Sequence, residues 1–122
     1  MRVAGLGFRD AASVASLRNA LQAAGGARGI DCLSTLDDKA TVASIQALAA
    51  ELNVPVRGIA QALLASMDTL TRSPRILDRF GTGSLAEAAA LAAAGPGARL
   101  LGPRAVSADG LATAAIAEGD NS

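Results

Sequence analysis

The sequence predicts an α/β fold: a three-layer α/β/α sandwich with a mostly parallel, mixed sheet and antiparallel pairing near the C-terminus. Two observations carry this prediction. Short apolar, β-prone runs alternate with segments whose apolar residues recur every three or four positions, which is typical of strands joined by amphipathic helices. The last β-prone run, 112–117, follows its predecessor across a polar turn at 107–110, which favours an antiparallel hairpin.

The N-terminal segment predicts a strand, a loop and a helix in succession. Residues 1–8 are apolar and β-prone, and the helix after them can be capped by Asp10 or Ser13. Gly5 and Gly7 begin a dinucleotide-binding pattern, but Asp10 stands where the third glycine would be. An acidic side chain there would repel a pyrophosphate, so the pattern disfavours a nucleotide site.

A second strand and helix are predicted over 30–35 and 42–52, with Asp37 and Asp38 between them beside Lys39, the only lysine. A carboxylate in the cap or first turn of a helix is stabilised by about 0.3 to 1 kcal/mol, which accounts for one aspartate. Adjacent carboxylates can also split their pKa values and supply a general acid or base. An ordinary solvated loop has the same composition.

A glycine-spaced polar loop leads directly into a third helix, predicted from Ser84 to about residue 94. Ser84 and Glu87 have the spacing of a capping box, in which the hydroxyl accepts from the amide of residue 87 and the carboxylate from the amide of residue 84. Gly81 and Gly83 have no Cβ, so a carboxylate or phosphate can approach the amides that precede the helix. A plain strand-to-helix turn has the same pattern.

The segments between and after these units have weaker patterns. Residues 53–57 resemble a turn and a brief strand, and 58–67 a short helix. Residues 68–80 are the least periodic part, with Ser73-Pro74-Arg75 expected to be extended. Because they include Arg72, Arg75 and Arg79, they are a candidate flap over a site or an ordinary solvated connection. A further strand is predicted at 98–101, and the polar tail, 118–122, is expected to fray.

The length and composition predict one domain that packs closely. A chain of 122 residues can bury one core, and we expect a single domain over 1–122. Much of the 51% hydrophobic content is alanine, so the helices must lie near the sheet. The 11 basic and 11 acidic residues give no net field that would recruit nucleic acid or an anionic membrane. Except for Lys39 the cations are arginines, which suit carboxylates, although a coding bias gives the same excess.

Several classes of site and location are disfavoured. Cys32 is the only cysteine and histidine is absent, so this chain alone supplies no disulfide, no Cys–His pair and no histidine metal site. We expect no metal and no cofactor. No apolar run reaches the roughly 18 to 20 residues of a membrane span, and the first residues lack the pattern of a secretory signal. We therefore expect a cytoplasmic location without membrane contact.

Three predicted connections, at Gly5, Ser34 and Gly81, lead from a strand or extended segment towards a helix start. In a sheet of parallel strands such connections open at the carboxyl edge, where ligands bind. We therefore expect these loops to line one cleft, with Gly7, Lys39 and Gly83 close together.

Three ordered stretches resemble the CobE and CbiG C-terminal family of cobalamin biosynthesis, most closely its standalone form. They are Val3-Ala4-Gly5-Leu6-Gly7-Phe8-Arg9, Ser34-Thr35-Leu36-Asp37-Asp38-Lys39-Ala40 and Thr82-Gly83-Ser84-Leu85-Ala86-Glu87-Ala88-Ala89-Ala90-Leu91, with 100–117 closing the chain. The resemblance covers nearly the whole chain. It implies a compact α/β domain that occurs alone or fused at the end of CbiG, the enzyme that opens the ring lactone of cobalt-precorrin-5A and releases acetaldehyde.

The resemblance also implies a site at positions that match the family. The family often has lysine where Arg104 stands, and this departure keeps the charge but prevents a neutral amine base. Asp38 and Glu87 are the catalytic candidates. The implied substrate-binding residues are Gly5, Gly7, Arg9, Asp38, Lys39, Gly83, Ser84, Glu87 and Arg104.

Two functions from different classes follow, with a third as background. Precorrins are flat macrocycles fringed with carboxylates, so Arg9, Lys39 and Arg104 together with three helix starts would suit a protein that binds or hands on a precorrin or other tetrapyrrole without catalysing a step alone. The alternative is a hydrolase that opens the ring lactone, with Asp38 or Glu87 as base and loop amides as oxyanion donors. A purely structural partner of another cobalamin-pathway enzyme is the third possibility.

Overall fold

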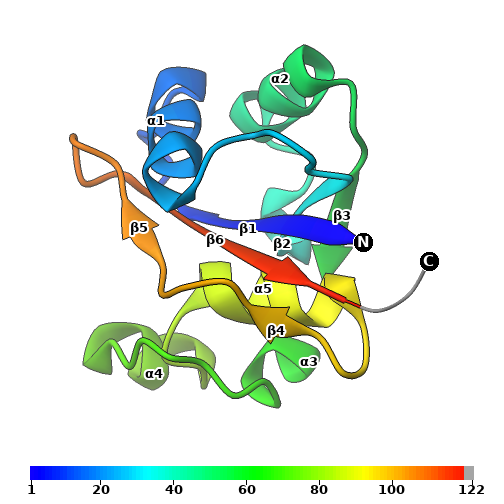
Figure 1. Ribbon diagram of the computed structural model, residues 1–122. Helices are drawn as coiled ribbons and strands as arrows, with labels where there is room; N and C mark the ends of the chain where they lie inside the picture. The colour runs from blue at the N-terminus through cyan, green and yellow to red at the C-terminus, as the bar shows by residue number, and fades with distance from the viewer. Residues whose placement is uncertain (120–122) are drawn as a thin grey trace.

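The computed structural model describes residues 1–119, which form a six-stranded sheet between two helical layers (Figure 1). The strand order is β3-β2-β1-β6-β4, and β5 also pairs with β6. β1 pairs in parallel with β2, and β2 with β3, whereas β6 is antiparallel to β1, β4 and β5. Every strand except β6 therefore runs in the same direction, and the predicted mixed, mostly parallel sheet is confirmed. The strands are β1 (Arg2–Phe8), β2 (Cys32–Leu36), β3 (Val56–Ile59), β4 (Arg99–Leu100), β5 (Ala105–Val106) and β6 (Ala112–Glu118).

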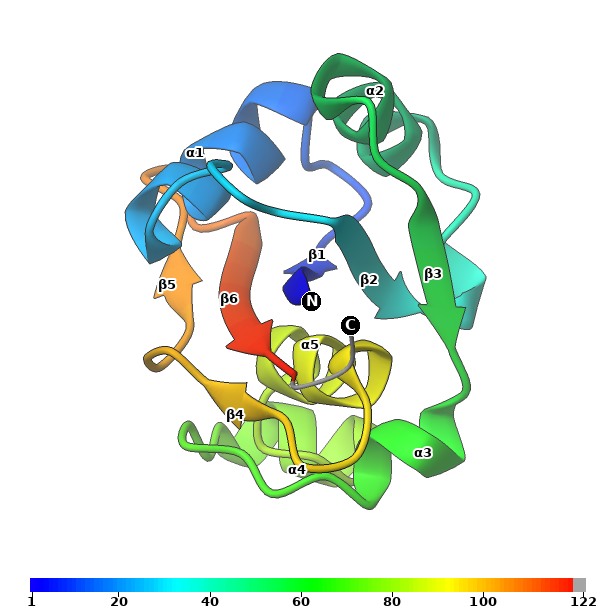
Figure 2. The same cartoon turned by 45° about the vertical axis from the view of Figure 1, so that its right-hand side comes forward.

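Helices cover both faces of the sheet, as the three-layer prediction requires. Helices α1 and α2 lie on one face, and α3, α4 and α5 lie on the other (Figures 1 and 2). A short 3-10 turn, Asp37–Lys39, follows β2. The helices are α1 (Val14–Ala24), α2 (Ala43–Leu52), α3 (Gln61–Ala65), α4 (Pro74–Phe80) and α5 (Leu85–Ala94).

Each face of the sheet has its own core. Leu6, Leu17 and Leu48 are fully buried between the sheet and the pair α1 and α2. Under α5 the buried side chains are mostly alanines, so the helix backbone approaches β1 closely at Gly5. This close packing is what the alanine-rich composition predicts.

The caps of the first two helices differ in part from the expectation. Ser13, one of the two predicted candidates, caps α1 by accepting from the amide of Ser16 at 3.2 Å. The prediction that Asp37 or Asp38 lies in the cap or first turn of the second helix is wrong. Both belong to the separate 3-10 turn, Asp37–Lys39, and the residue that precedes α2 is Val42.

The least periodic segment contains a helix that the sequence did not predict. Ser73 is extended, as expected for a residue before proline, with φ −77° and ψ 118°. Pro74 nevertheless starts α4, because a proline at the first helical position has the required φ and loses no hydrogen bond there. The helix ends at Gly81, which has a left-handed φ of 75°, and no residue of α4 is buried.

The C-terminal strand extends farther than predicted. Glu118 was expected to fray, but it ends β6 and forms ion pairs with Arg2 at 2.8 Å and Arg99 at 3.4 Å. Gly119 is buried and its amide donates to the carbonyl of Met1 at 2.9 Å, so it does not fray either. The remaining predicted tail, 120–122, lies outside the described residues. Within 1–119, no helix has the length and apolar character needed to cross a membrane.

Candidate functional site

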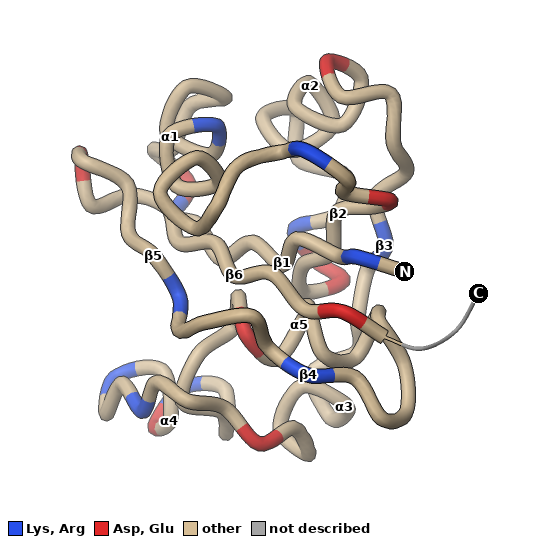
Figure 3. Tube along the Cα trace, viewed as in Figure 1, with Lys and Arg blue, Asp and Glu red and all other residues tan. Residues whose placement is uncertain are grey.

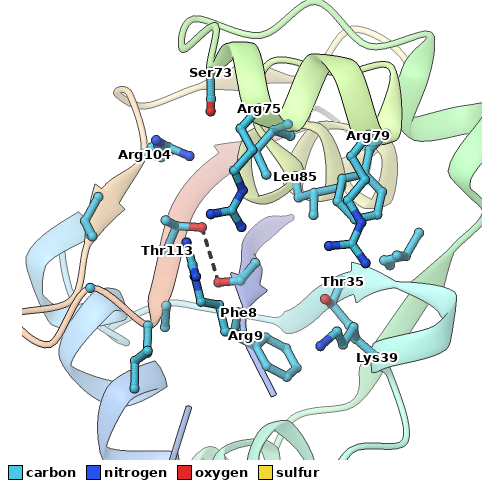
Figure 4. A pocket seen from close by; sticks show the side chains of 18 of the residues that line it. Phe8, Arg9, Thr35, Lys39, Ser73, Arg75, Arg79, Leu85, Arg104 and Thr113 are labelled. Atoms are coloured by element: carbon cyan, nitrogen blue, oxygen red, sulfur yellow. Dashed lines mark hydrogen bonds between the residues drawn. The ribbon is translucent and has the colours of Figure 1, made fainter. Parts of the chain in front are cut away.

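A cavity of about 530 Å³ lies where β1 and β2 end, between this edge of the sheet and α4 (Figure 4). Parallel strands bring their carboxyl ends to one edge, which is where α/β folds bind ligands. Four parts of the chain that are distant in sequence meet here. The lining residues are Gly7, Phe8, Arg9, Asp10, Thr35, Leu36, Lys39, Ser73, Arg75, Ile76, Arg79, Phe80, Leu85, Arg104, Val106, Gly110, Leu111, Ala112 and Thr113.

Positive charge dominates the cavity, although the whole chain is neutral. Among the lining residues there are five cations and a single carboxylate, Asp10. Lys39 binds Asp10 at 2.6 Å, and the Asp10 side chain is 99% exposed, so it lies at the rim. The hydrogen bond and charge of Lys39 lower the pKa of Asp10, and Arg79 lowers it further. The five cations are Arg9, Lys39, Arg75, Arg79 and Arg104.

The arginines of this cavity form no ion pair with an acidic side chain in the part of the chain that the structure describes. Within 1–119, no ion pair involves Arg9, Arg75, Arg79 or Arg104. Arg75 and Arg79 are one helical turn apart, and both extend from α4 into the cavity towards the ends of β1 and β2 (Figure 4). Figure 3 shows the basic positions gathered along α4 and just before β5. These unpaired guanidinium groups can bind anions, above all carboxylates, in bidentate geometry.

Apolar side chains lie beside these charges. Phe8 and Leu36, the last residues of β1 and β2, line the cavity together with Ile76 and Phe80 of α4. The Lys39 ammonium lies 5.2 Å from the centre of the Phe8 ring, within cation–π distance. The cavity therefore suits a ligand that is apolar in its body and anionic at its edges.

The comparisons with known proteins identify the family. The family described as cobalamin synthesis G C-terminus matches residues 2–117. The chain belongs to this family. The resemblance found in the sequence is confirmed, and the chain is a member of a cobalamin biosynthesis protein family.

Solved structures of cobalamin biosynthesis proteins have the same fold. CobE, a protein from the cobalamin biosynthetic pathway, is 33% identical, with a TM-score of 0.81 over 96% of this chain and 92% of that one. The cobalamin biosynthesis protein chiG from Agrobacterium tumefaciens is 39% identical, with a TM-score of 0.70 over 99% and 100% of the two chains. A putative cobalamin biosynthesis protein G homolog from Sulfolobus solfataricus shares the fold at 17% identity, with a TM-score of 0.69; the match covers 99% of this chain and 37% of that one. Among curated protein sequences, none matches the chain.

Four of the predicted substrate-binding residues of this cobalamin-synthesis domain line the cavity: Gly7, Arg9, Lys39 and Arg104. Gly7 lies near the end of β1 and Lys39 in the 3-10 turn after β2, and both line the cavity at one edge of the sheet, as the topology argument requires. The third connection contributes Leu85, the first residue of α5, instead of Gly83.

The other predicted site residues lie outside the lining. Asp38 is exposed on the 3-10 turn, and Ser84 is fully buried. A Cβ on Gly83 would overlap the Thr71 carbonyl oxygen, so the missing side chain makes room for this chain's own loop. As ligand contacts, the five predicted residues outside the lining stay predictions. These five residues are Gly5, Asp38, Gly83, Ser84 and Glu87.

The predicted capping box at α5 is correct in only one half. Ser84 accepts from the amide of Glu87 at 3.2 Å, but the Glu87 carboxylate does not accept from Ser84. It accepts instead from the amides of Leu70, Thr71 and Arg104 and from the Thr71 hydroxyl. Burial alone would raise the pKa of Glu87, but these hydrogen bonds hold it below its ordinary value, so the carboxylate is ionised.

The arginines of segment 68–80 were predicted only as part of a candidate flap or of a solvated connection, and two of the three, Arg75 and Arg79, line the cavity. Their density in the sequence was the one signal available. Thr113 and Phe80 also line the cavity, and nothing in the local pattern marks them. Within 1–119, no three His, Cys, Asp or Glu side chains lie close enough to hold a metal ion.

Proposed function

We propose that this domain binds an anionic tetrapyrrole intermediate of corrin ring synthesis in the cavity and hands it on without catalysing a step alone. The observation that carries the proposal is a set of four arginines around a cavity that also has apolar walls; none of the four forms an ion pair within residues 1–119. On this proposal the protein acts in the cytoplasm, as a single domain, beside the pathway enzymes that supply and receive the intermediate.

The chemistry of the ligand fits both halves of the lining. A precorrin has a flat apolar macrocycle, which Phe8, Leu36 and Phe80 can contact, and a fringe of acetate and propionate arms. The cations stand on opposite sides of the cavity, with Arg9 and Lys39 at the sheet edge and the others on α4 and before β5. Carboxylates on several sides of one ring can therefore be bound at once. The volume of about 530 Å³ falls in the range of ligand pockets, roughly 300 to 1,000 Å³.

Titration with hydrogenobyrinic acid tests the proposal. We expect a saturable shift of its visible absorption band at micromolar protein, and no shift with cobinamide, whose ring side chains are amides. Arg79→Ala should weaken binding, whereas Arg28→Ala removes the same charge at an exposed position outside the cavity and should not. Absence of a shift with the wild-type protein, or equal losses in the two variants, would count against the proposal.

The lactone-opening alternative has less support from the positions of its candidate bases. Both oxygens of Glu87 already accept hydrogen bonds inside the protein, and Asp38 lies outside the cavity. Incubating the protein with the lactone substrate and measuring acetaldehyde distinguishes the two functions. Release of acetaldehyde at a catalytic rate would favour the hydrolase.

A further inference from the structure

One buried carboxylate connects two walls of the cavity. Glu87 is fully buried on α5, with none of its surface exposed. Its Oε1 accepts from the amides of Leu70 at 2.6 Å and Thr71 at 2.8 Å. Its Oε2 accepts from the Thr71 hydroxyl at 2.5 Å and from the amide of Arg104 at 2.8 Å. A single side chain thus holds the loop that leads to α4 and the segment that leads to β5.

The helix α4 depends on this loop for its position. None of its residues is buried, so α4 has little packing of its own against the core. Next to the Glu87 bonds, the Ser73 amide donates to the carbonyl of Gly83 at 2.9 Å. Arg75 and Arg79 follow directly, and their places in the cavity are set by how the loop before them is held.

Capping does not explain the presence of a charge at this position. Ser84 already caps α5, and a buried carboxylate costs desolvation unless hydrogen bonds compensate it. Here the compensating donors belong to the loop before α4 (Leu70 and Thr71) and to Arg104, which lines the cavity before β5. Charge-assisted hydrogen bonds are also roughly twice as strong as neutral ones, so they define the positions of their donors well.

We propose that Glu87 is a positioning residue, which holds Arg75, Arg79 and Arg104 at the spacing that an anionic macrocycle needs and does not itself touch the ligand. This inference rests on the proposed function, because it assigns these three cations to ligand binding. Arg9 and Lys39, at the ends of β1 and β2, are outside its reach, since none of their hydrogen bonds involves Glu87.

The variant Glu87→Gln tests the inference with little change in shape. In the variant an NH₂ group replaces one carboxylate oxygen of Glu87. Because NH₂ cannot accept hydrogen bonds, the N–H and O–H donors that now bind this oxygen lose their acceptor. We expect hydrogenobyrinic acid to bind about tenfold more weakly or worse. The salt dependence of binding should become shallower, because fewer cations reach the ligand. A variant that is only less stable would bind with the wild-type salt dependence.

A double-mutant cycle identifies which cations depend on Glu87. Arg79→Ala and Arg104→Ala should each cost less affinity in the Glu87→Gln protein than in the wild type. Arg9→Ala is the matched control and should cost the same in both. If each of the three Arg→Ala substitutions costs the same affinity in the Glu87→Gln protein as in the wild type, the inference is overturned.

A measurement without ligand separates this inference from the proposed function. Glu87→Gln should speed amide hydrogen exchange at Leu77 and Gly81 of the α4 region, whereas Leu21→Val, which removes one buried methylene on the other face of the sheet, should not do so selectively. If the wild type binds no tetrapyrrole, the proposed function and the ligand-binding role both fail. If hydrogen exchange in α4 is unchanged in Glu87→Gln, this result alone would overturn the inference that Glu87 positions α4, whether or not the protein binds a tetrapyrrole.

Discussion

The backbone of Gly5 lies directly against the carbonyl oxygen of Ala86, which a Cβ on Gly5 would overlap. Such a Cβ would also stand 2.6 Å from the amide nitrogen of Ala90. Because backbone atoms of α5 occupy this space, no rotamer change can relieve the clash. The glycine therefore sets the distance between α5 and β1, and through it the place of Leu85 at the cavity.

Gly5→Ala should destabilise the fold by about 3 kcal/mol or more, at the upper end of what overpacking costs, because α5 must move away from β1. The control is Gly102→Ala, since a Cβ there has no atom within 4 Å and Gly102 has no positive φ. Urea unfolding followed by circular dichroism measures both variants. Similar midpoints for the two would contradict the close approach of α5.

The hydrogen bonds to Glu87 predict how acid affects stability. They hold its pKa below the ordinary value of 4.5, so the unfolded chain takes up a proton at higher pH than the folded protein. The contribution of Glu87 is then complete above the ordinary pKa and is lost as pH falls through the folded pKa. We expect Glu87→Gln to be less stable than the wild type near pH 7.

That difference between the two proteins should shrink in acid, between about pH 4.5 and the lower pKa of the folded protein. Several other carboxylates also have lowered pKa values, among them Asp10 and Glu118, but they are common to both proteins and cancel. Urea unfolding of the pair across this pH range is the measurement. A difference in unfolding free energy that stays constant down to the lowest pH would contradict an ionised, hydrogen-bonded Glu87.

The sequence predicted what depends on near neighbours. Alternating patterns identified the layers and the sheet, and Ser84 was recognised as the cap of α5 because cap and amide are three residues apart. The partners of Glu87 are 16 and 17 residues away on both sides, so a local rule assigned its carboxylate to the wrong amide. Gly83 was interpreted as an opening for a ligand, because the sequence does not reveal that its own chain returns to fill the space.

The same distinction applies to the site. Topology predicted that Gly7 and Lys39 meet, since parallel strands end at one edge. The approach of α4 to that edge depends on the loop that Glu87 holds, which is a tertiary contact. Only the density of arginines in 68–80 pointed to it in advance.

Removal of the cap hydroxyl of Ser84 should weaken the start of α5. The Ser84 oxygen accepts from the Glu87 amide at 3.2 Å and is fully buried. Ser84→Ala should cost about 1 kcal/mol, within the usual range of roughly 0.5 to 2 for a lost cap, and Ser13→Ala at α1 should cost a similar amount. Thermal unfolding at pH 7 measures both, and an unchanged melting temperature for Ser84→Ala would contradict the capping role.

Asp10 is the single acidic side chain in the cavity lining, and its removal should strengthen anion binding. It now binds the Lys39 ammonium at 2.6 Å, so a ligand carboxylate must compete with it. Asp10→Asn frees Lys39 and removes a negative charge, and we expect hydrogenobyrinic acid to bind about two- to fivefold more tightly at low salt, with the gain reduced as ionic strength rises. Glu51→Gln makes the same change of charge on α2, outside the cavity, and should leave the affinity unchanged. Weaker binding by Asp10→Asn would mean that this carboxylate takes part in recognition. The inference that the cavity contacts only anionic groups at the edge of the ligand would then be wrong.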